Sequence, residues 1–180
     1  MQTRLFIWLS LAAVLAIALT ALGVAANVAT MTAQAAPKLL RRCENNYSQD
    51  EIDEMIANGE DGYEPDDCAL LAPTLTGPMW HNFCQPDDED WVKFAARANT
   101  IYQIRAAAPS NYPTEPHLDL IDDGNVVAQN DHYFGSDAEI WWWNTGAERT
   151  VYVRVTELRG RAECGNSEYT LLLKAFKDKP

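Results

Sequence analysis

The chain has 180 residues, a length that suits one domain with appendages and excludes a large multidomain enzyme. It contains 14 basic and 26 acidic side chains, so its formal net charge at pH 7 is −12. Such an acidic chain is a poor partner for nucleic acid or anionic lipid, because phosphate contacts need clustered Lys and Arg. Apolar residues make up 47% of the chain, which is enough for a packed core and argues against disorder throughout.

The N-terminal segment has the pattern of a secretory signal peptide. Residues 5–26 are apolar except for Ser10 and Thr20, and they follow a single basic residue, Arg4. The small residues that end at Ala35 form a cleavage pattern, so we predict a signal peptide over residues 1–35 and a secreted or cell-surface location. The alternative is a structural cell-surface protein, because an uncut segment of this length can anchor the chain in a membrane.

All four cysteines lie after the predicted cleavage point. An even number of cysteines in an exported chain predicts two disulfides. Closeness in the sequence favours pairing of Cys43 with Cys68, which leaves Cys84 for Cys164, but the sequence does not exclude the other pairings. A zinc site is the alternative, although the Cys-x-x-Cys spacing typical of such sites does not occur.

Acidic residues are concentrated early in the exported part of the chain. Residues 44–91 contain 14 acidic side chains and no Lys or Arg. Within this segment, Ser48-Gln49-Asp50-Glu51 has the form of a capping box, apolar residues follow at helical spacing, and Asn58-Gly59 supplies a stop. We therefore predict a short amphipathic helix over residues 49–57, inside an N-terminal extension that spans residues 36–62.

From residue 80 onward the chain consists of short runs rich in aromatic and β-branched residues, with turn residues between them. Side chains alternate in character along residues 100–106 and 150–156, which is the period of a half-buried strand. Tight turns are predicted at residues 122–125 and 144–146. Eight strands are predicted in all, over residues 80–84, 91–96, 100–106, 117–121, 125–128, 139–143, 150–156 and 169–176. Regular strands without helical crossovers predict an all-β, antiparallel sandwich.

Several motifs, in order along the chain, resemble the bacterial pre-peptidase C-terminal domain. They are Tyr63-Glu64-Pro65-Asp66-Asp67, Asp88-Glu89-Asp90-Trp91-Val92-Lys93-Phe94, Leu118-x-Leu120-Ile121-Asp122-x-Gly124, Asn130-Asp131, Val151-Tyr152-Val153-Arg154-Val155 and Tyr169-x-Leu171. The family is similar to the collagen-binding modules of clostridial collagenases. The resemblance implies a jelly-roll β-sandwich over residues 63–178, of a kind usually attached to secreted proteases. The chain departs from the family pattern at Asp66, where Asn is usual, and at Asp87, where Gly is common.

Two acidic stretches, residues 64–67 and 87–90, suggest a metal site. If they fold side by side, their carboxylates cannot all remain ionised without a cation. Ca²⁺, which takes about six to eight oxygen ligands, suits the available groups. The resemblance implies that the ligands are Glu64, Asp66, Asp67, Asp87 or Asp88, and Asp90. A solvated acidic loop is the alternative interpretation.

Three consecutive tryptophans, Trp141, Trp142 and Trp143, form the second unusual feature. Because side chains alternate along a strand, Trp142 must face away from its two neighbours, so at least one indole is expected to be partly exposed. An exposed indole can stack on a sugar ring or a proline-rich peptide, which makes these residues candidate ligand-binding residues. The alternative is that two indoles pack in the core and one lies under a loop. Trp91 is expected to anchor the acidic loop in the core.

Motifs of several enzyme classes do not occur, including His-Glu-x-x-His, Gly-x-Ser-x-Gly and a glycine-rich phosphate loop. His81, His117 and His132 could in principle bind zinc, but they are far apart in the sequence. Paired carboxylates could serve a small secreted carbohydrate-active hydrolase, which is the alternative function. The sequence favours a secreted, non-catalytic binding or accessory module stabilised by Ca²⁺. Its predicted partner is an extracellular peptide or polysaccharide, or a secreted protease.

Overall fold

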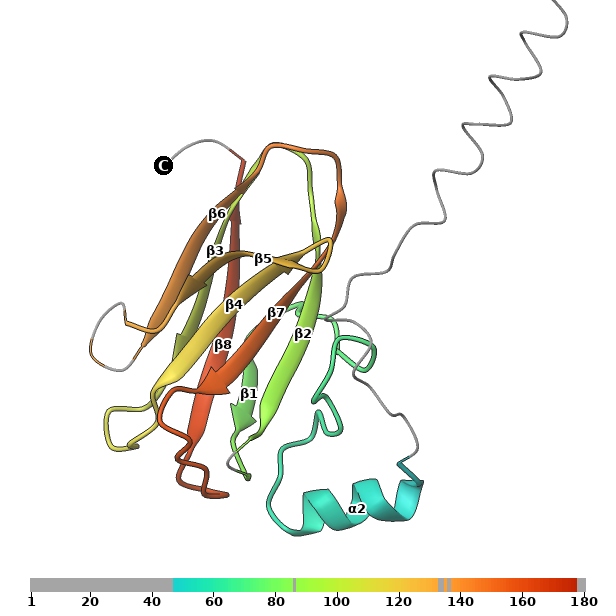
Figure 1. Cartoon of the computed structure of the whole chain (residues 1–180), viewed down its shortest axis with the longest axis vertical. Helices are drawn as coiled ribbons and strands as arrows, with labels where there is room; N and C mark the ends of the chain where they lie inside the picture. The colour runs from blue at the N-terminus through green and yellow to red at the C-terminus, as the bar shows by residue number, and fades with distance from the viewer. Residues whose placement is uncertain (1–46, 86, 133–134, 136, 178–180) are drawn as a thin grey trace, which may run out of the picture. The chain divides into compact units, whose positions relative to one another are not determined.

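A computed structural model describes residues 47–85, 87–132, 135 and 137–177. In this part of the chain, eight strands form two antiparallel four-stranded sheets that face each other (Figure 1). The elements are α2 Gln49–Ala57, β1 Met79–Asn82, β2 Glu89–Ala96, β3 Thr100–Ala107, β4 Pro116–Asp122, β5 Asn125–Asn130, β6 Ala138–Asn144, β7 Arg149–Glu157 and β8 Glu168–Phe176. The predicted all-β sandwich is confirmed.

The two sheets have the strand orders β1-β8-β3-β6 and β2-β7-β4-β5. Successive strands cross from one sheet to the other, except for the hairpin of β4 and β5. This is the jelly-roll arrangement, in which pairs of adjacent strands are far apart in the sequence. The last strand, β8, lies between β1 and β3 in the middle of its sheet.

The core lies between the two sheets and follows the alternation along the strands. On β3 the side chains of Tyr102 and Ile104 are buried while those of Ile101 and Gln103 are less so. The valines at positions 151, 153 and 155 of β7 are fully buried and come from the opposite sheet. Each strand therefore gives one face to a common hydrophobic core, as its period of two requires.

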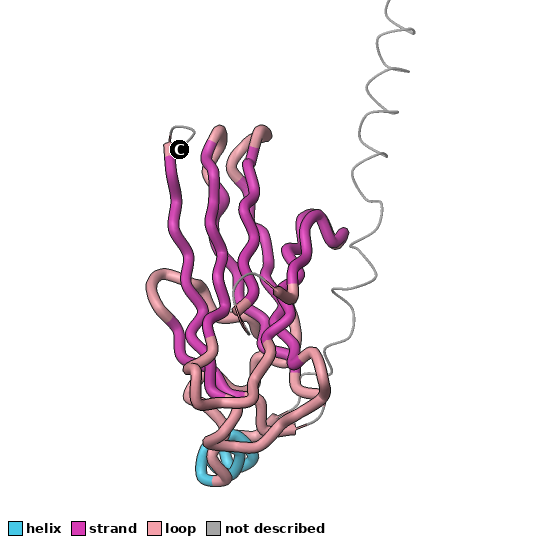
Figure 2. Tube along the Cα trace, turned by 90° about the vertical axis from the view of Figure 1, so that its left-hand side faces the viewer, coloured by secondary structure: helices cyan, strands magenta, loops and turns pink. Residues whose placement is uncertain are grey.

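The helix α2, cyan in Figure 2, spans the nine predicted residues, and local capping specifies where it begins. The Glu51 amide donates to the Ser48 hydroxyl at 3.3 Å, and the Ser48 amide donates to the Glu51 carboxylate at 2.7 Å. Gly59, with φ of +100°, follows the C-cap Asn58 and accommodates the left-handed conformation there. No residue of α2 is buried, so capping rather than core packing defines this element.

The segment that follows the helix runs beside β2. The Trp91 amide donates to the Asp66 carbonyl at 3.0 Å, and the Lys93 amide donates to the Pro73 carbonyl at 2.9 Å. Ala69 and Ala72 cover the outer face of the β2-β7-β4-β5 sheet and pack with Trp91 in a second apolar cluster. Trp91 is thus buried as expected, but outside the core between the sheets.

A disulfide joins Cys84, just after β1, to Cys164, just before β8. This is the pairing that the sequence favours for these two residues. Cys68 is also disulfide-bonded, while its predicted partner Cys43 lies outside the described residues. The predicted signal peptide over residues 1–35 lies outside them as well. Within the described residues, no helix has the length and apolar character needed to cross a membrane.

Substitution of two hydrophobic residues in the hairpin of β4 and β5 should change the free energy of unfolding by very different amounts. Leu120 of β4 is fully buried, so Leu120→Ala should lower the free energy of unfolding by about 3 kcal/mol through lost burial and a residual cavity. Val127 of β5 is 45% exposed, so Val127→Ala should cost less than about 0.5 kcal/mol. Urea denaturation of both variants measures these changes. Equal losses would contradict the placement of the core.

Candidate functional site

The candidate site lies inside one end of the sandwich, where β1 ends and β2 begins. Asp90 is the second residue of β2 and points into the space between the sheets, while its neighbour Trp91 points outward. The Asp90 carboxylate is fully buried and accepts a hydrogen bond of 2.5 Å from the Tyr169 hydroxyl. Because Tyr169 belongs to β8, this hydrogen bond links the two sheets.

The acidic arm, which we define as residues 59–67, brings two more carboxylates to this position. The backbone hydrogen bond between Trp91 and Asp66 places the arm next to β2. The Asp66 amide in turn donates to the Glu64 carboxylate at 3.2 Å. One carboxylate oxygen from each of Glu64, Asp66 and Asp90 lies within 4.8 Å of the other two. We call these three residues the buried acidic cluster, since their exposed fractions are only 8%, 0% and 0%.

His81 of β1 is the cationic neighbour of this cluster. Its Nδ1 lies 3.7 Å from Asp66 Oδ2, 3.6 Å from Asp90 Oδ1 and 3.3 Å from Asp61 Oδ2. The imidazole ring is held between two phenol rings, at centroid distances of 4.8 Å to Tyr63 and 5.5 Å to Tyr169. A single imidazolium cannot balance the surrounding carboxylates if all of them are ionised.

Several polar atoms of the site have no hydrogen-bond partner among the described residues. They are both carboxylate oxygens of Asp66, one oxygen of Asp90 and both ring nitrogens of His81. A buried polar atom without a partner is costly, and a buried charge without one is more so. Asp61 differs, because its oxygens accept from the Tyr63 amide at 2.8 Å and the Asn82 amide at 3.0 Å. The unpartnered oxygens thus belong to the residues best placed to bind a cation.

Burial raises the pKa values of all three carboxyl groups in the cluster, which favours their protonated forms. Burial, followed by the charge of Asp88, raises the pKa of Glu64 to about 9. Burial also raises the pKa values of Asp66 and Asp90, whose charges repel each other. Burial alone would lower the pKa of His81, but the carboxylates of Asp61 and Asp90 raise it to about 11. A divalent cation would replace the protons and let the carboxylates ionise.

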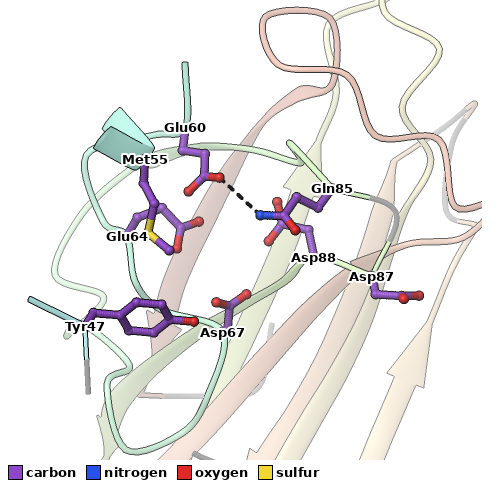
Figure 3. A pocket seen from close by; sticks show the side chains of 8 residues that line it. All are labelled: Tyr47, Met55, Glu60, Glu64, Asp67, Gln85, Asp87 and Asp88. Carbon is purple, nitrogen blue, oxygen red and sulfur yellow. Dashed lines mark hydrogen bonds between the residues drawn. The ribbon is translucent and has the colours of Figure 1, made fainter. Parts of the chain in front are cut away.

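An outer pocket adjoins the buried acidic cluster (Figure 3). Its hollow of about 450 Å³ is lined by Tyr47, Met55, Glu60, Glu64, Asp67, Gln85, Asp87 and Asp88. Burial and the charge of Asp90 raise the pKa of Asp88 to about 7, although Asp88 also accepts a 2.7 Å hydrogen bond from the Cys84 amide. Glu64 belongs to both the pocket and the buried acidic cluster.

The structure divides the six predicted metal ligands into two groups. Glu64, Asp66 and Asp90 form the buried acidic cluster, whereas Asp67, Asp87 and Asp88 line the outer pocket. Three further residues of the site were not among the predicted ligands of the acidic site, namely Asp61, His81 and Tyr169. His81 and Tyr169 are paired residues of neighbouring strands, so only knowledge of the strand register could have placed them together.

The three histidines do not share one site among the described residues. His81 lies with the acidic cluster, whereas the nearest carboxylates to the other two are Asp119, 3.2 Å from His117, and Asp131, 3.1 Å from His132. Among the described residues, His81 is the only one of the three histidines that belongs to a group of side chains able to hold a metal. A zinc site built from all three histidines is therefore excluded by the fold.

The tryptophan triplet is split between the two faces of its sheet. Trp141 and Trp143 are 48% and 59% exposed on the outer face. Trp142 packs against the core, with its ring 6.1 Å from that of Tyr102. Trp142 is half-buried against the core, so of the three predicted ligand-binding residues Trp141 and Trp143 are the more exposed. The alternative of two indoles in the core is corrected, because two of the three are exposed.

Comparisons with known proteins give similarity in structure but not in sequence. No family model and no curated protein matches this chain. Its structure is similar to the pre-peptidase C-terminal domain of a Bacillus anthracis collagenase, with 17% identity, a TM-score of 0.44, and coverage of 56% of this chain and 90% of the other. It is also similar to PliG of Aeromonas hydrophila, a periplasmic inhibitor of g-type lysozyme, with 11% identity, a TM-score of 0.40, and coverage of 58% and 96%. The first of these is the type of domain that the sequence motifs resemble.

Proposed function

We propose that this chain is a secreted, non-catalytic binding module whose fold is stabilised by Ca²⁺. The observation that carries the proposal is the buried acidic cluster, in which oxygens of Asp66 and Asp90 lack partners next to Glu64. A fold that buries three carboxylates around one point gains most from a cation at that point. An apolar signal-like segment and a disulfide are consistent with an exported protein.

Calcium suits the cluster better than other divalent ions. The donors are carboxylate oxygens, which are hard ligands, and they come from a strand and an irregular arm. Ca²⁺ accepts flexible oxygen coordination, whereas Mg²⁺ demands near-ideal octahedral geometry and retains water. Zn²⁺ prefers sites with more nitrogen or sulfur ligands than the one imidazole of His81 supplies.

The proposed role of the cation is structural. Glu64 and Asp66 belong to the acidic arm, and Asp90 belongs to the sandwich, so an ion held by all three ties one to the other. Any ligand that binds only the folded state stabilises it by mass action, by about 2.7 kcal/mol at 100 times Kd. The cation would also remove the cost of unpartnered oxygens in the interior.

The same burial argues against hydrolysis as the function. A glycosidase needs two carboxyl groups that flank a sugar bond in an accessible cleft. The carboxylates of Glu64, Asp66 and Asp90 are almost completely buried and lie too close together to enclose a sugar ring. By contrast, Trp141 and Trp143 present large exposed apolar surfaces, which are characteristic of binding sites.

Calcium should raise the melting temperature of the protein. With Ca²⁺ in large excess over Kd, differential scanning calorimetry should show a midpoint roughly 5–10 °C above that in EDTA. Asp90→Asn should abolish the Ca²⁺-dependent shift, because it removes a charged ligand. Asp87→Asn is the matched control, since Asp87 is exposed and outside the buried acidic cluster. An unchanged midpoint in the unsubstituted protein would remove calcium from the proposal.

Without calcium, the stability of the protein should fall as the pH rises. The pKa of Glu64 is raised from 4.5 to about 9, so between these values the folded state binds more protons than the unfolded state. Stability is then lost with increasing pH, and the raised pKa of His81 acts in the same direction.

Urea denaturation in EDTA at pH 5 and pH 8 tests this dependence. Calcium should stabilise the protein more at pH 8, because it replaces the protons that the acids then begin to lose. Metal-free protein that becomes more stable with rising pH would contradict the assignment of the acidic cluster.

A further inference from the structure

The outer face of the β1-β8-β3-β6 sheet carries a group of aromatic side chains. Trp143 pairs in register with Ile101 of β3, which pairs in turn with Phe176 of β8. The Trp141 ring stacks on that of Phe176 at a centroid distance of 5.5 Å and an interplanar angle of 25°. Ile101, Trp141, Trp143 and Phe176 thus form an apolar surface across three neighbouring strands, which we call the aromatic platform.

Polar groups adjoin the aromatic platform and fix one of its rings. The Glu139 carboxylate accepts from the Trp141 indole nitrogen at 2.6 Å and from the Gln103 amide nitrogen at 2.9 Å. Arg105, two residues after Gln103 on β3 and the register partner of Glu139, forms an ion pair with Asp137. The surface therefore offers flat apolar rings with hydrogen-bond donors and acceptors beside them.

The aromatic platform is electrically neutral in a strongly acidic protein. The charged side chains in the adjoining register rows are Arg105, Glu139 and Lys174; Asp137, just before β6, pairs with Arg105, so the formal charges of these four residues cancel. The chain as a whole carries −12. The acidic remainder of the molecule would repel an anionic polymer, and it would draw a cationic one to the acidic regions rather than to this neutral surface. Charge therefore selects an uncharged ligand.

Building on the proposed binding function, we infer that the aromatic platform binds an uncharged polysaccharide. A pyranose ring has an apolar C–H face that stacks on an aromatic ring and hydroxyl groups that both donate and accept hydrogen bonds. The rings of Trp141 and Trp143 supply the stacking surface, while the half-buried Gln103 beside them can meet the hydroxyl groups with its amide oxygen. Peptides are usually bound in aromatic grooves or along free sheet edges. This surface is the face of a sheet, so it suits a sugar chain better than a peptide.

Binding to polysaccharides and to control polymers tests this inference. The purified chain, loaded with Ca²⁺, is incubated with insoluble cellulose, chitin, xylan and starch, with anionic polygalacturonate, and with gelatin. Retention on at least one of the four neutral polymers is expected, equally in low and high salt, with none on polygalacturonate. Trp143→Ala should weaken that retention by about tenfold or more, as expected for loss of an aromatic anchor.

Trp80→Ala provides the matched control. Trp80 is 60% exposed, against 59% for Trp143, and lies on the same sheet. Its register partner Thr170 is six residues from Phe176 along β8, so Trp80 lies outside the aromatic platform. Trp80→Ala should bind as the unsubstituted protein does. Equal losses in both variants, or none in Trp143→Ala, would overturn the inference.

The other outcomes separate this inference from the proposed function. If the protein is retained on gelatin alone and Trp143→Ala removes that retention, the polysaccharide inference is wrong and the proposed binding function stands. Retention on polygalacturonate alone would refute the neutral ligand. A protein that melts cooperatively with Ca²⁺ but is retained on none of the polymers would overturn the inference and leave the Ca²⁺-stabilised fold standing. Each variant is melted in parallel, so a loss of retention is not confused with a loss of fold.

Discussion

The hydrogen bond from the Trp91 amide to the Asp66 carbonyl fixes where the acidic arm lies. It places the arm alongside the edge of β2, one residue from Asp90. Ala69 and Ala72, which follow the arm in the chain, pack over Trp91 on the outer face of the sheet. Apolar packing therefore also holds this part of the chain against β2. This backbone contact brings Glu64 and Asp66 close to Asp90, although these carboxylates repel one another when they are ionised.

Polar groups from both sheets meet at the site. Asp90 comes from one sheet, and Tyr169 and His81 come from the other. The disulfide between Cys84 and Cys164 closes the same end, and the Cys84 amide contacts Asp88 of the outer pocket. The disulfide and the hydrogen bond between Asp90 and Tyr169 thus constrain the same end of the sandwich in which the carboxylates are buried.

Sequence patterns predicted the strands and α2 well, because both depend on local periodicity and capping. They also indicated the acidic stretches, but not how the run of four acids from Asp87 to Asp90 divides. Strand alternation begins at Glu89, and only Asp90 faces the interior, which no count of charges could show. His81 had no local signal, since its neighbours in the cluster come from a distant arm and strand. Alternation did predict that Trp142 faces away from Trp141 and Trp143, but it could not say which side lies inside.

The position of β8 sets the order in which this molecule can become complete. The last strand described, β8, fills the middle of its sheet, between β1 and β3, and it carries Tyr169. Until β8 docks, β1 has no neighbour in its sheet among the described strands, and Asp90 has no phenol to contact. Docking of this one strand therefore joins β1 to the rest of the sheet and closes the buried site in the same step.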